Sequence, residues 1–265
     1  MTYTVWKTRL TQGNAFDNAD VARCYAHRPP YAPALLGRLL ELAPGRNQLV
    51  DLGCGPGKVA VGLAPHFAHT LALDPAAAMI DEARHAHSAP NITWLHASAE
   101  DAPLPDRIDL VTAGTSVHWM KHAVVFPKLA ERTDLFATLW VEAPPDPRWD
   151  TAYRALMTDW LGRIGQIYDP MNFPKRILDY EAWLDKQGHE TFRVPFRQSI
   201  DGYIAQMHST ATFSRARMGA DLAEEFGSDL RDVLAPYASD GLLIFDTVST
   251  LVWGTPRRYA HGTES

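Results

Sequence analysis

Short apolar runs alternate with longer amphipathic stretches through the first half of the chain. Runs with the length of strands lie at residues 48–52, 70–73, 92–95, 109–113 and 135–141. Stretches with helical spacing lie at residues 32–42, 58–67, 76–86 and 124–131. Each predicted strand is almost entirely apolar, which is typical of parallel strands covered by helices on both faces. The pattern therefore predicts an α/β fold around a parallel sheet.

The alternation stops at residues 143–147, where three prolines interrupt it. Beyond them we predict helices over 149–165, 175–186, 200–209 and 220–234, and strands over 191–196 and 242–253. We therefore expect N-terminal helices and a core over residues 1–143, and a helical cap insertion over 144–188. The remaining core strands with substrate-side helices follow over 189–258, and a flexible tail over 259–265.

The 265-residue chain has the composition of an ordinary globular protein, with 46% hydrophobic and 21% charged residues. Its formal charge is -6, from 25 basic and 31 acidic residues, so electrostatics favour neither nucleic acid nor an anionic membrane as a partner. Cys24 and Cys54 form no C-x-x-C pattern, so we expect neither a disulfide nor a thiolate zinc site. Without a recognisable secretory signal or transmembrane segment, we expect a soluble cytoplasmic protein.

A glycine-rich turn follows the first predicted strand. After Asp51 at the strand end, glycine occupies every second position, as Gly53, Gly55 and Gly57. Such a turn leaves the main chain uncovered, so its N–H groups can face a ligand closely. Asp74 ends the second predicted strand, where a carboxylate can accept hydrogen bonds from both hydroxyls of a ribose. The turn and Asp74 together predict a nucleoside-binding site.

The residues after the glycines argue against two other nucleotide loops. In a dinucleotide loop a third small residue lies beneath the pyrophosphate, and Lys58 stands at that place here. A P-loop requires serine or threonine after its lysine, and Val59 follows Lys58. The segment instead resembles the D-x-G-x-G-x-G loop of class I S-adenosylmethionine-dependent methyltransferases.

Three further segments resemble the type 11 group of these methyltransferases, and in particular its branch similar to trans-aconitate methyltransferases. They are residues 97–105, residues 109–119 with their His-Trp ending, and the segment 25–31 with its Tyr, Arg-Pro and Tyr. The resemblance covers most of the chain. It implies a Rossmann-like α/β fold, with a seven-stranded mixed sheet, helices on both faces and a helical cap insertion.

The resemblance also implies which residues bind S-adenosyl-L-methionine. Ser98 stands where the family usually has aspartate, which replaces an ionised acceptor near the adenine with a hydroxyl. Arg28 is expected to hold the cofactor carboxylate together with Tyr25. The full expected set is Tyr25, Arg28, Asp51, Gly53, Gly55, Gly57, Asp74, Pro75, Met79, Ser98, Ala99, Glu100, Ala113 and Gly114.

For the acceptor side, the resemblance places His118 and Trp119 in the substrate pocket, and we add Tyr31, Tyr168 and His208 as candidates. A sulfonium methyl group is already activated, so catalysis consists mainly of in-line placement of the acceptor atom at ~3 Å. A hydroxyl, amine or acidic carbon would also need a base, and His118 is the candidate because an ordinary histidine pKa lies near ~6.5. His118 stays open as a base, an orienting residue or a packed residue.

We expect an enzyme that methylates an O, N, S or C atom of a small organic molecule, with specialised metabolism as one setting. Three alternatives stay open: an NAD-dependent oxidoreductase, an RNA-modifying methyltransferase, and a methyltransferase-fold protein that binds the cofactor as a regulator. We expect no metal site, because the histidine pairs at 66 and 69 and at 85 and 87 lack carboxylate support. We also expect no nucleic-acid or membrane partner, and a monomer or homodimer.

Overall fold

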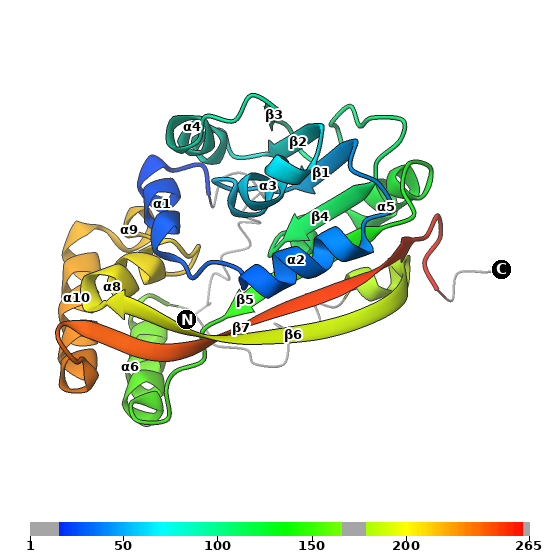
Figure 1. Cartoon of the computed structure of the whole chain (residues 1–265). Helices are drawn as coiled ribbons and strands as arrows, with labels where there is room; N and C mark the ends of the chain where they lie inside the picture. The colour runs from blue at the N-terminus through cyan, green and yellow to red at the C-terminus, as the bar shows by residue number, and fades with distance from the viewer. Residues whose placement is uncertain (1–15, 166–178, 262–265) are drawn as a thin grey trace.

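Seven strands form one mixed sheet in the order β3-β2-β1-β4-β5-β7-β6 (Figure 1). The computed structural model describes residues 16–165 and 179–261. The parallel strands are β1 (Gln48–Leu52), β2 (His69–Asp74), β3 (Ile92–His96), β4 (Leu110–Gly114) and β5 (Phe136–Glu142). β7 (Leu242–Pro256) runs antiparallel to β5 and to β6 (Leu184–Ser199). The predicted seven-stranded mixed sheet is confirmed.

The parallel strands are covered on both faces, which explains why each reads as an apolar run. Leu49 and Leu110 pack under α2 (Pro33–Leu42) and α3 (Lys58–Leu63), which the 3-10 turn Ala64–His66 extends. Val50 and Val111 face the opposite layer, which contains α5 (His122–Ala130). Successive side chains of a strand point to opposite faces, so these neighbouring residues serve two separate hydrophobic layers. α4 (Ala77–Ala86) packs against β2 and β3.

The β6–β7 hairpin carries the helical cap. β6 and β7 have 16 and 15 residues, whereas β1 has 5, and the hairpin extends past the rest of the sheet (Figure 1). Its distal residues Leu243 and Phe245 join a hydrophobic cluster with Trp149, Trp160 and Phe226. The cap helices are α6 (Asp150–Arg163), α8 (Ile200–His208), α9 (Arg215–Met218) and α10 (Ala220–Leu234), followed by the 3-10 turn Ala235–Tyr237. α1 (Ala19–Cys24) packs between α4 and α8.

The helix predicted over 175–186 is wrong over its described part. Asp179–Trp183 is a 3-10 turn, and β6 begins at Leu184. Residues 184–188, which the expected domain division assigns to the insertion, therefore belong to the sheet. The Gln-Gly breaker at 187–188 marks a bulge in β6, where a Cβ at Gly188 would collide with the ring of Trp253. A breaker that ends a helix and one that bulges a strand look alike in sequence.

The remaining predicted elements are present with small shifts at their ends, except that the strand predicted over 191–196 is much longer. No helix within residues 16–165 and 179–261 has the length and apolar character needed to cross a membrane.

Candidate active site

The loop between β1 and α3 depends on glycine for its close approach to neighbouring strands. Gly53 and Gly57 have φ angles of 64° and 93°, in the left-handed region. A Cβ at Gly53 would lie 2.6 Å from the Cβ of Ser116, and one at Gly57 would lie 2.5 Å from the ring of Trp94. A side chain at either position would therefore push the loop away from the strands that support it.

Asp74 connects this loop to the start of α4. Its carboxylate accepts hydrogen bonds from the backbone N–H groups of Gly55 and Ala76, each at 2.9 Å. Burial raises the pKa of Asp74 above its usual value, and the two N–H groups oppose this rise. Each carboxylate oxygen makes one such bond, so lone pairs remain on both for a ligand.

Asp51 lies at the base of the loop and is fully buried. Its carboxyl accepts hydrogen bonds from the Thr112 hydroxyl at 2.8 Å and from the Ala60 N–H at 3.2 Å. Burial raises the pKa of Asp51 to about 7. The side chain thus joins β1 to β4 and α3, which holds the glycine loop between them.

Two cavities open near the carboxyl ends of β1 and β4, where the strand order reverses and ligands bind in open α/β sheets. The first is lined by Phe16, Tyr25, Gly53, Gly55, Asp74, Pro75, Met79, Ser98, Ala99, Glu100, Gly114, Thr115, Ser116, Trp119 and Met120. The second is lined by Tyr25, Arg28, Pro29, Tyr31, Asp51, Gly53, Cys54, Gly55, Pro56, Lys58, Val59, Gly114, Thr115, Val141, Ala143, Gln206, Met207 and Thr210. Because five residues line both, the cavities meet at Tyr25, Gly53, Gly55, Gly114 and Thr115.

A pair of hydroxyl groups lies at this junction. Thr115 has a φ angle of 55°, which is unusual for a β-branched residue, and its Oγ1 is 3.2 Å from the Oη of Tyr31. A Cβ at Gly114 would lie 2.8 Å from that Oη, so the phenol occupies space that glycine leaves open. Burial raises the pKa of Tyr31, which keeps the phenol protonated at neutral pH.

Arg28 ties the N-terminal segment to the cap. Its Nε donates to the Ser209 Oγ at 2.7 Å, and its Nη2 donates to the Ser209 carbonyl at 2.8 Å. The guanidinium also stacks on the ring of Tyr25, 3.8 Å from its centroid. The position of Arg28 in the second cavity therefore depends on a residue that directly follows α8.

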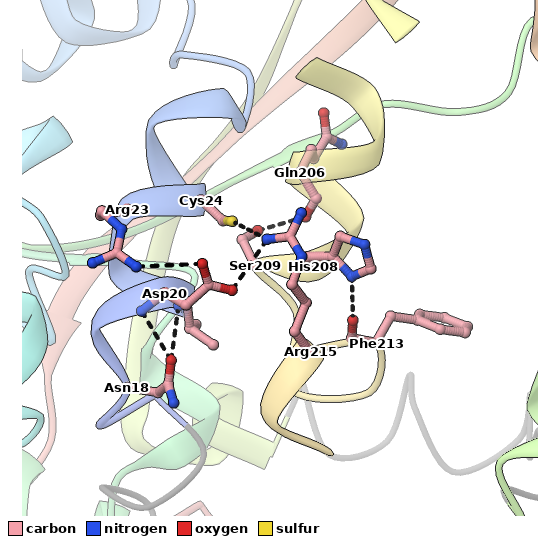
Figure 2. Close-up of polar contacts among 10 residues, drawn as sticks. Asn18, Asp20, Arg23, Cys24, Gln206, His208, Ser209, Phe213 and Arg215 are labelled. Carbon is pink, nitrogen blue, oxygen red and sulfur yellow. Dashed lines mark hydrogen bonds and ion pairs between the residues drawn. The ribbon is translucent and has the colours of Figure 1, made fainter. Parts of the chain in front are cut away.

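A second contact joins α1 to the cap, as Figure 2 shows. Arg215 of α9 forms an ion pair with Asp20 at 3.1 Å and donates to the Cys24 sulfur at 3.4 Å. Burial, as the largest effect, raises the pKa of the Cys24 thiol. The helix that precedes Tyr25 is thus fixed against α9 as well as α8.

Comparisons with known proteins agree with this geometry. A family model described as a methyltransferase domain matches residues 49–133. A trans-aconitate 2-methyltransferase of Methylobacterium nodulans is 31% identical over 181 residues, which cover 65% of this chain and 68% of that protein. The chain belongs to the class I S-adenosylmethionine-dependent methyltransferases.

Other relatives of this methyltransferase match over different lengths. A malonyl-[acyl-carrier protein] O-methyltransferase of Anoxybacillus flavithermus is 25% identical, over 85% of this chain and 86% of that protein. The match to a Saccharomyces cerevisiae protein named as an S-adenosylmethionine-dependent methyltransferase spans 44% of that protein, at 27% identity. A solved structure from Anaeromyxobacter dehalogenans, described as a candidate type II methyltransferase, has the same fold, with a TM-score of 0.63 and 24% identity over 88% of this chain and 99% of that one.

The methyltransferase brings most of the expected cofactor residues to one place. The first cavity is lined by Tyr25, Gly53, Gly55, Asp74, Pro75, Met79, Ser98, Ala99, Glu100 and Gly114, and the second by Arg28 and Asp51. Gly57 and Ala113 line neither cavity, although both belong to segments that border them. The Ser98 hydroxyl donates to the Asp101 carboxylate at 2.7 Å, so a carboxylate lies next to the position where the family usually has one.

The expected acceptor residues are more scattered. Trp119 lines the first cavity and Tyr31 the second, whereas His118 and His208 line neither. The ring of His118 lies beside that of Trp119, with 5.1 Å between centroids. His208 is buried in the cap, with Nδ1 2.8 Å from the Phe213 carbonyl oxygen (Figure 2), and burial lowers its pKa. Tyr168 lies outside the described residues, and all these roles stay predictions.

Several lining residues were not expected from the sequence. Phe16, Thr115, Ser116 and Met120 join the first cavity, and Lys58, Gln206, Met207 and Thr210 join the second. From the sequence, Lys58 indicates only that the loop does not bind a pyrophosphate. The α8 residues Gln206 and Met207 carry no motif, because a helix that contributes to a cavity has the same spacing as one that only packs.

Proposed function

We propose that this methyltransferase transfers the methyl group of S-adenosyl-L-methionine to a small organic acceptor that binds in the second cavity. The bound sulfonium supplies an activated methyl group, whose bond to sulfur breaks as the bond to the acceptor forms. The observation that carries the proposal is the junction at Gly114 and Thr115, where a cavity lined by the expected cofactor residues opens into a second one. Such a junction allows the in-line approach that the reaction requires.

The residues of the first cavity fit the nucleoside part of the cofactor. Asp74 keeps lone pairs on both oxygens for the ribose hydroxyls. Met79 provides a buried apolar surface for an adenine ring, and Ala99 and Glu100 line the same cavity. Arg28, in the adjoining cavity, has N–H groups beyond the two bound to Ser209 and can hold the amino-acid carboxylate.

Three observations favour a small acceptor over RNA. The formal charge of -6 gives no general attraction for a phosphate backbone. The relatives named above include a trans-aconitate and a malonyl-[acyl-carrier protein] methyltransferase. A cavity that the cap helix α8 helps to enclose also suits a compact ligand.

Tyr31, Cys54 and Asp51 of the second cavity are poorly suited to remove a proton from the acceptor. The phenol of Tyr31 and the thiol of Cys54 both have raised pKa values because they are buried. Asp51 is engaged with Thr112 and Ala60. Since His118 does not line this cavity, we assign it no base function here, and its role remains a prediction.

Asp74→Ala tests the cofactor half of the proposal. Loss of the ribose contacts should weaken binding of S-adenosylhomocysteine about 10- to 100-fold, since hydrogen bonds to a charged group contribute ~1.5–3 kcal/mol. Isothermal titration calorimetry measures the affinity, and thermal unfolding checks that the loop stays folded.

Asp81→Ala is the matched control, because Asp81 lies on α4 but is exposed and lines neither cavity. Equal affinities of the wild type and the Asp74 variant would remove the assignment. Binding of NADH in place of S-adenosylhomocysteine would favour the oxidoreductase alternative. Turnover of an isotope-labelled methyl donor with small organic acids, amines and phenols then tests the acceptor half.

A further inference from the structure

A half-buried cation in the second cavity has no role in the transfer described so far. Lys58 is the first residue of α3, and it lines the second cavity together with Arg28. Its Nζ donates a hydrogen bond to the carbonyl oxygen of Arg28. The ammonium and guanidinium groups thus border the same enclosed space.

Neither cation has a carboxylate partner among residues 16–165 and 179–261, where no ion pair involves Lys58 or Arg28. Asp51 lines the cavity, but its carboxyl is bonded to other groups and its pKa is raised to about 7. Burial, followed by the charge of Arg28, lowers the pKa of Lys58 to about 8. Both side chains are half-buried, and a charge that is partly removed from water without a partner is unfavourable, so the cavity is suited to an anion.

The cofactor alone does not supply enough negative charge. S-adenosylmethionine carries a positive sulfonium, a positive ammonium group and one carboxylate, so its net charge is positive. If Arg28 holds that carboxylate, the ammonium of Lys58 stays next to a ligand of the same sign. An anionic group from the second ligand would offset this repulsion.

On the basis of the proposed function, we propose that Lys58 binds a carboxylate of the methyl acceptor, which is therefore an organic acid. This carboxylate is an anchor, distinct from the atom that is methylated, because pairing with an ammonium lowers the nucleophilicity of an oxygen. The reacting atom lies instead toward Gly114 and Thr115, where the two cavities meet.

Gln206 adds a second polar contact to this anchor. Its Oε1 is buried and has no hydrogen-bond partner among the described residues, and the residue lines the same cavity. An unpaired buried amide oxygen is unfavourable. A hydroxyl or N–H group on the acid would satisfy it.

Binding of an organic acid is measured first, with glutarate, succinate and citrate titrated into the protein saturated with S-adenosylhomocysteine. At about pH 8, roughly half of Lys58 is neutral, so an anion that raises its pKa causes uptake of up to about half a proton. Calorimetry in two buffers of different ionisation enthalpy measures this uptake, which should decline toward about pH 6.5. Dimethyl glutarate, the neutral analogue, should not bind.

The other titratable groups that line this cavity are Tyr25, Arg28, Tyr31, Asp51 and Cys54. Two substitutions of Lys58 distinguish proton uptake by the lysine from proton uptake by these other groups. Lys58→Met should weaken glutarate at least about 10-fold, the loss of one charged hydrogen bond, and abolish the uptake at about pH 8. Lys58→Arg should keep most of the affinity but not the uptake, because guanidinium stays protonated. Lys186→Met, at an exposed lysine of β6, should change neither quantity.

Several outcomes would overturn the assignment. Wild-type affinity of Lys58→Met for all three acids would show that Lys58 is not the anchor, as would the failure of every acid to bind the wild type. Loss of S-adenosylhomocysteine affinity in Lys58→Met, with acid binding unchanged, would assign Lys58 to the cofactor carboxylate. All three results leave the proposed function standing, whereas failure of the wild type to bind S-adenosylhomocysteine would remove that function itself.

Discussion

Thr115 shows how single residues of this site adopt states that are unfavourable elsewhere. A β-branched residue in the left-handed region costs on the order of 1–2 kcal/mol. The conformation persists because the Thr115 N–H donates to the Leu139 carbonyl at 2.7 Å, and the side chain meets the hydroxyl of Tyr31. Asp51, which is buried, and Lys58, which is half-buried, are comparable cases, since burial shifts the pKa of each of these groups beside the glycine loop. Such concentrations of strain and shifted pKa values are typical of functional sites.

The strain at Thr115 can be separated from its hydrogen bond by two substitutions. Thr115→Asn tolerates the left-handed conformation and keeps a polar group, so its free energy of unfolding should match or exceed that of the wild type. Thr115→Val keeps the strain but loses the contact with Tyr31, which should lower the free energy of unfolding by about 1 kcal/mol. Denaturant titrations compare the two variants. A valine variant as stable as the asparagine variant would contradict this account.

At the scale of elements, the sequence predicts the parallel half of the molecule well. Its strands are apolar on both faces, so β1 to β5 stand out as runs between amphipathic helices. β6 is different because its residues alternate between exposed and half-buried, and only part of it was recognised. The sequence predicts a helix end at Gly188, where the structure has a bulge. The ring that leaves no room for a side chain there belongs to Trp253, which is far away in the sequence.

The residues of the site also fall into two groups: those that a local sequence motif predicts, and those whose position depends on contacts with distant parts of the chain. The glycine loop and Asp74 are predictable because the ligand contacts come from one β-α-β unit. Thr115 and the α8 residues were missed, since strain and the position of a cap helix arise from tertiary contacts. His208 was chosen from its chemistry, yet its helix directs it into the cap interior, against Phe213.

At the contact between η1 (Tyr25–His27) and α8, a residue that lines neither cavity should affect the binding of the cofactor. Ser209 is fully buried, and its Oγ accepts from Arg28. Ser209→Ala should weaken S-adenosylhomocysteine about 3- to 10-fold, the value of one hydrogen bond. Adenosine, which lacks the carboxylate, should bind both proteins equally if Arg28 holds that group. An equal loss for both ligands in calorimetry would instead indicate a general disturbance of the site.

At the scale of the whole molecule, the two cavities are built by different parts. The first is lined by residues that precede residue 121, from the N-terminal segment, the parallel strands and the helices and loops that connect them. The second adds Ala143 and the α8 residues Gln206 and Met207, together with Thr210 beyond the helix. α8 is held by the cap cluster, in which Phe226 is fully buried and stacks on Phe213 with 4.8 Å between ring centroids. Packing of the cap should therefore control acceptor binding without controlling binding of the nucleoside part of the cofactor.

Phe226→Leu tests this division of labour. The smaller side chain loosens the cap cluster and should lower the free energy of unfolding by about 1–3 kcal/mol. Calorimetry should then show weaker binding of glutarate, with the affinity for adenosine unchanged, because no cap residue lines the first cavity. Phe126→Leu is the matched control: Phe126 is equally buried but packs under the sheet, so its loss should destabilise the protein and leave glutarate affinity unchanged. If Phe226→Leu reduces the affinities for both ligands in parallel, the cap affects both cavities. That result would contradict the prediction that cap packing acts on the second cavity alone.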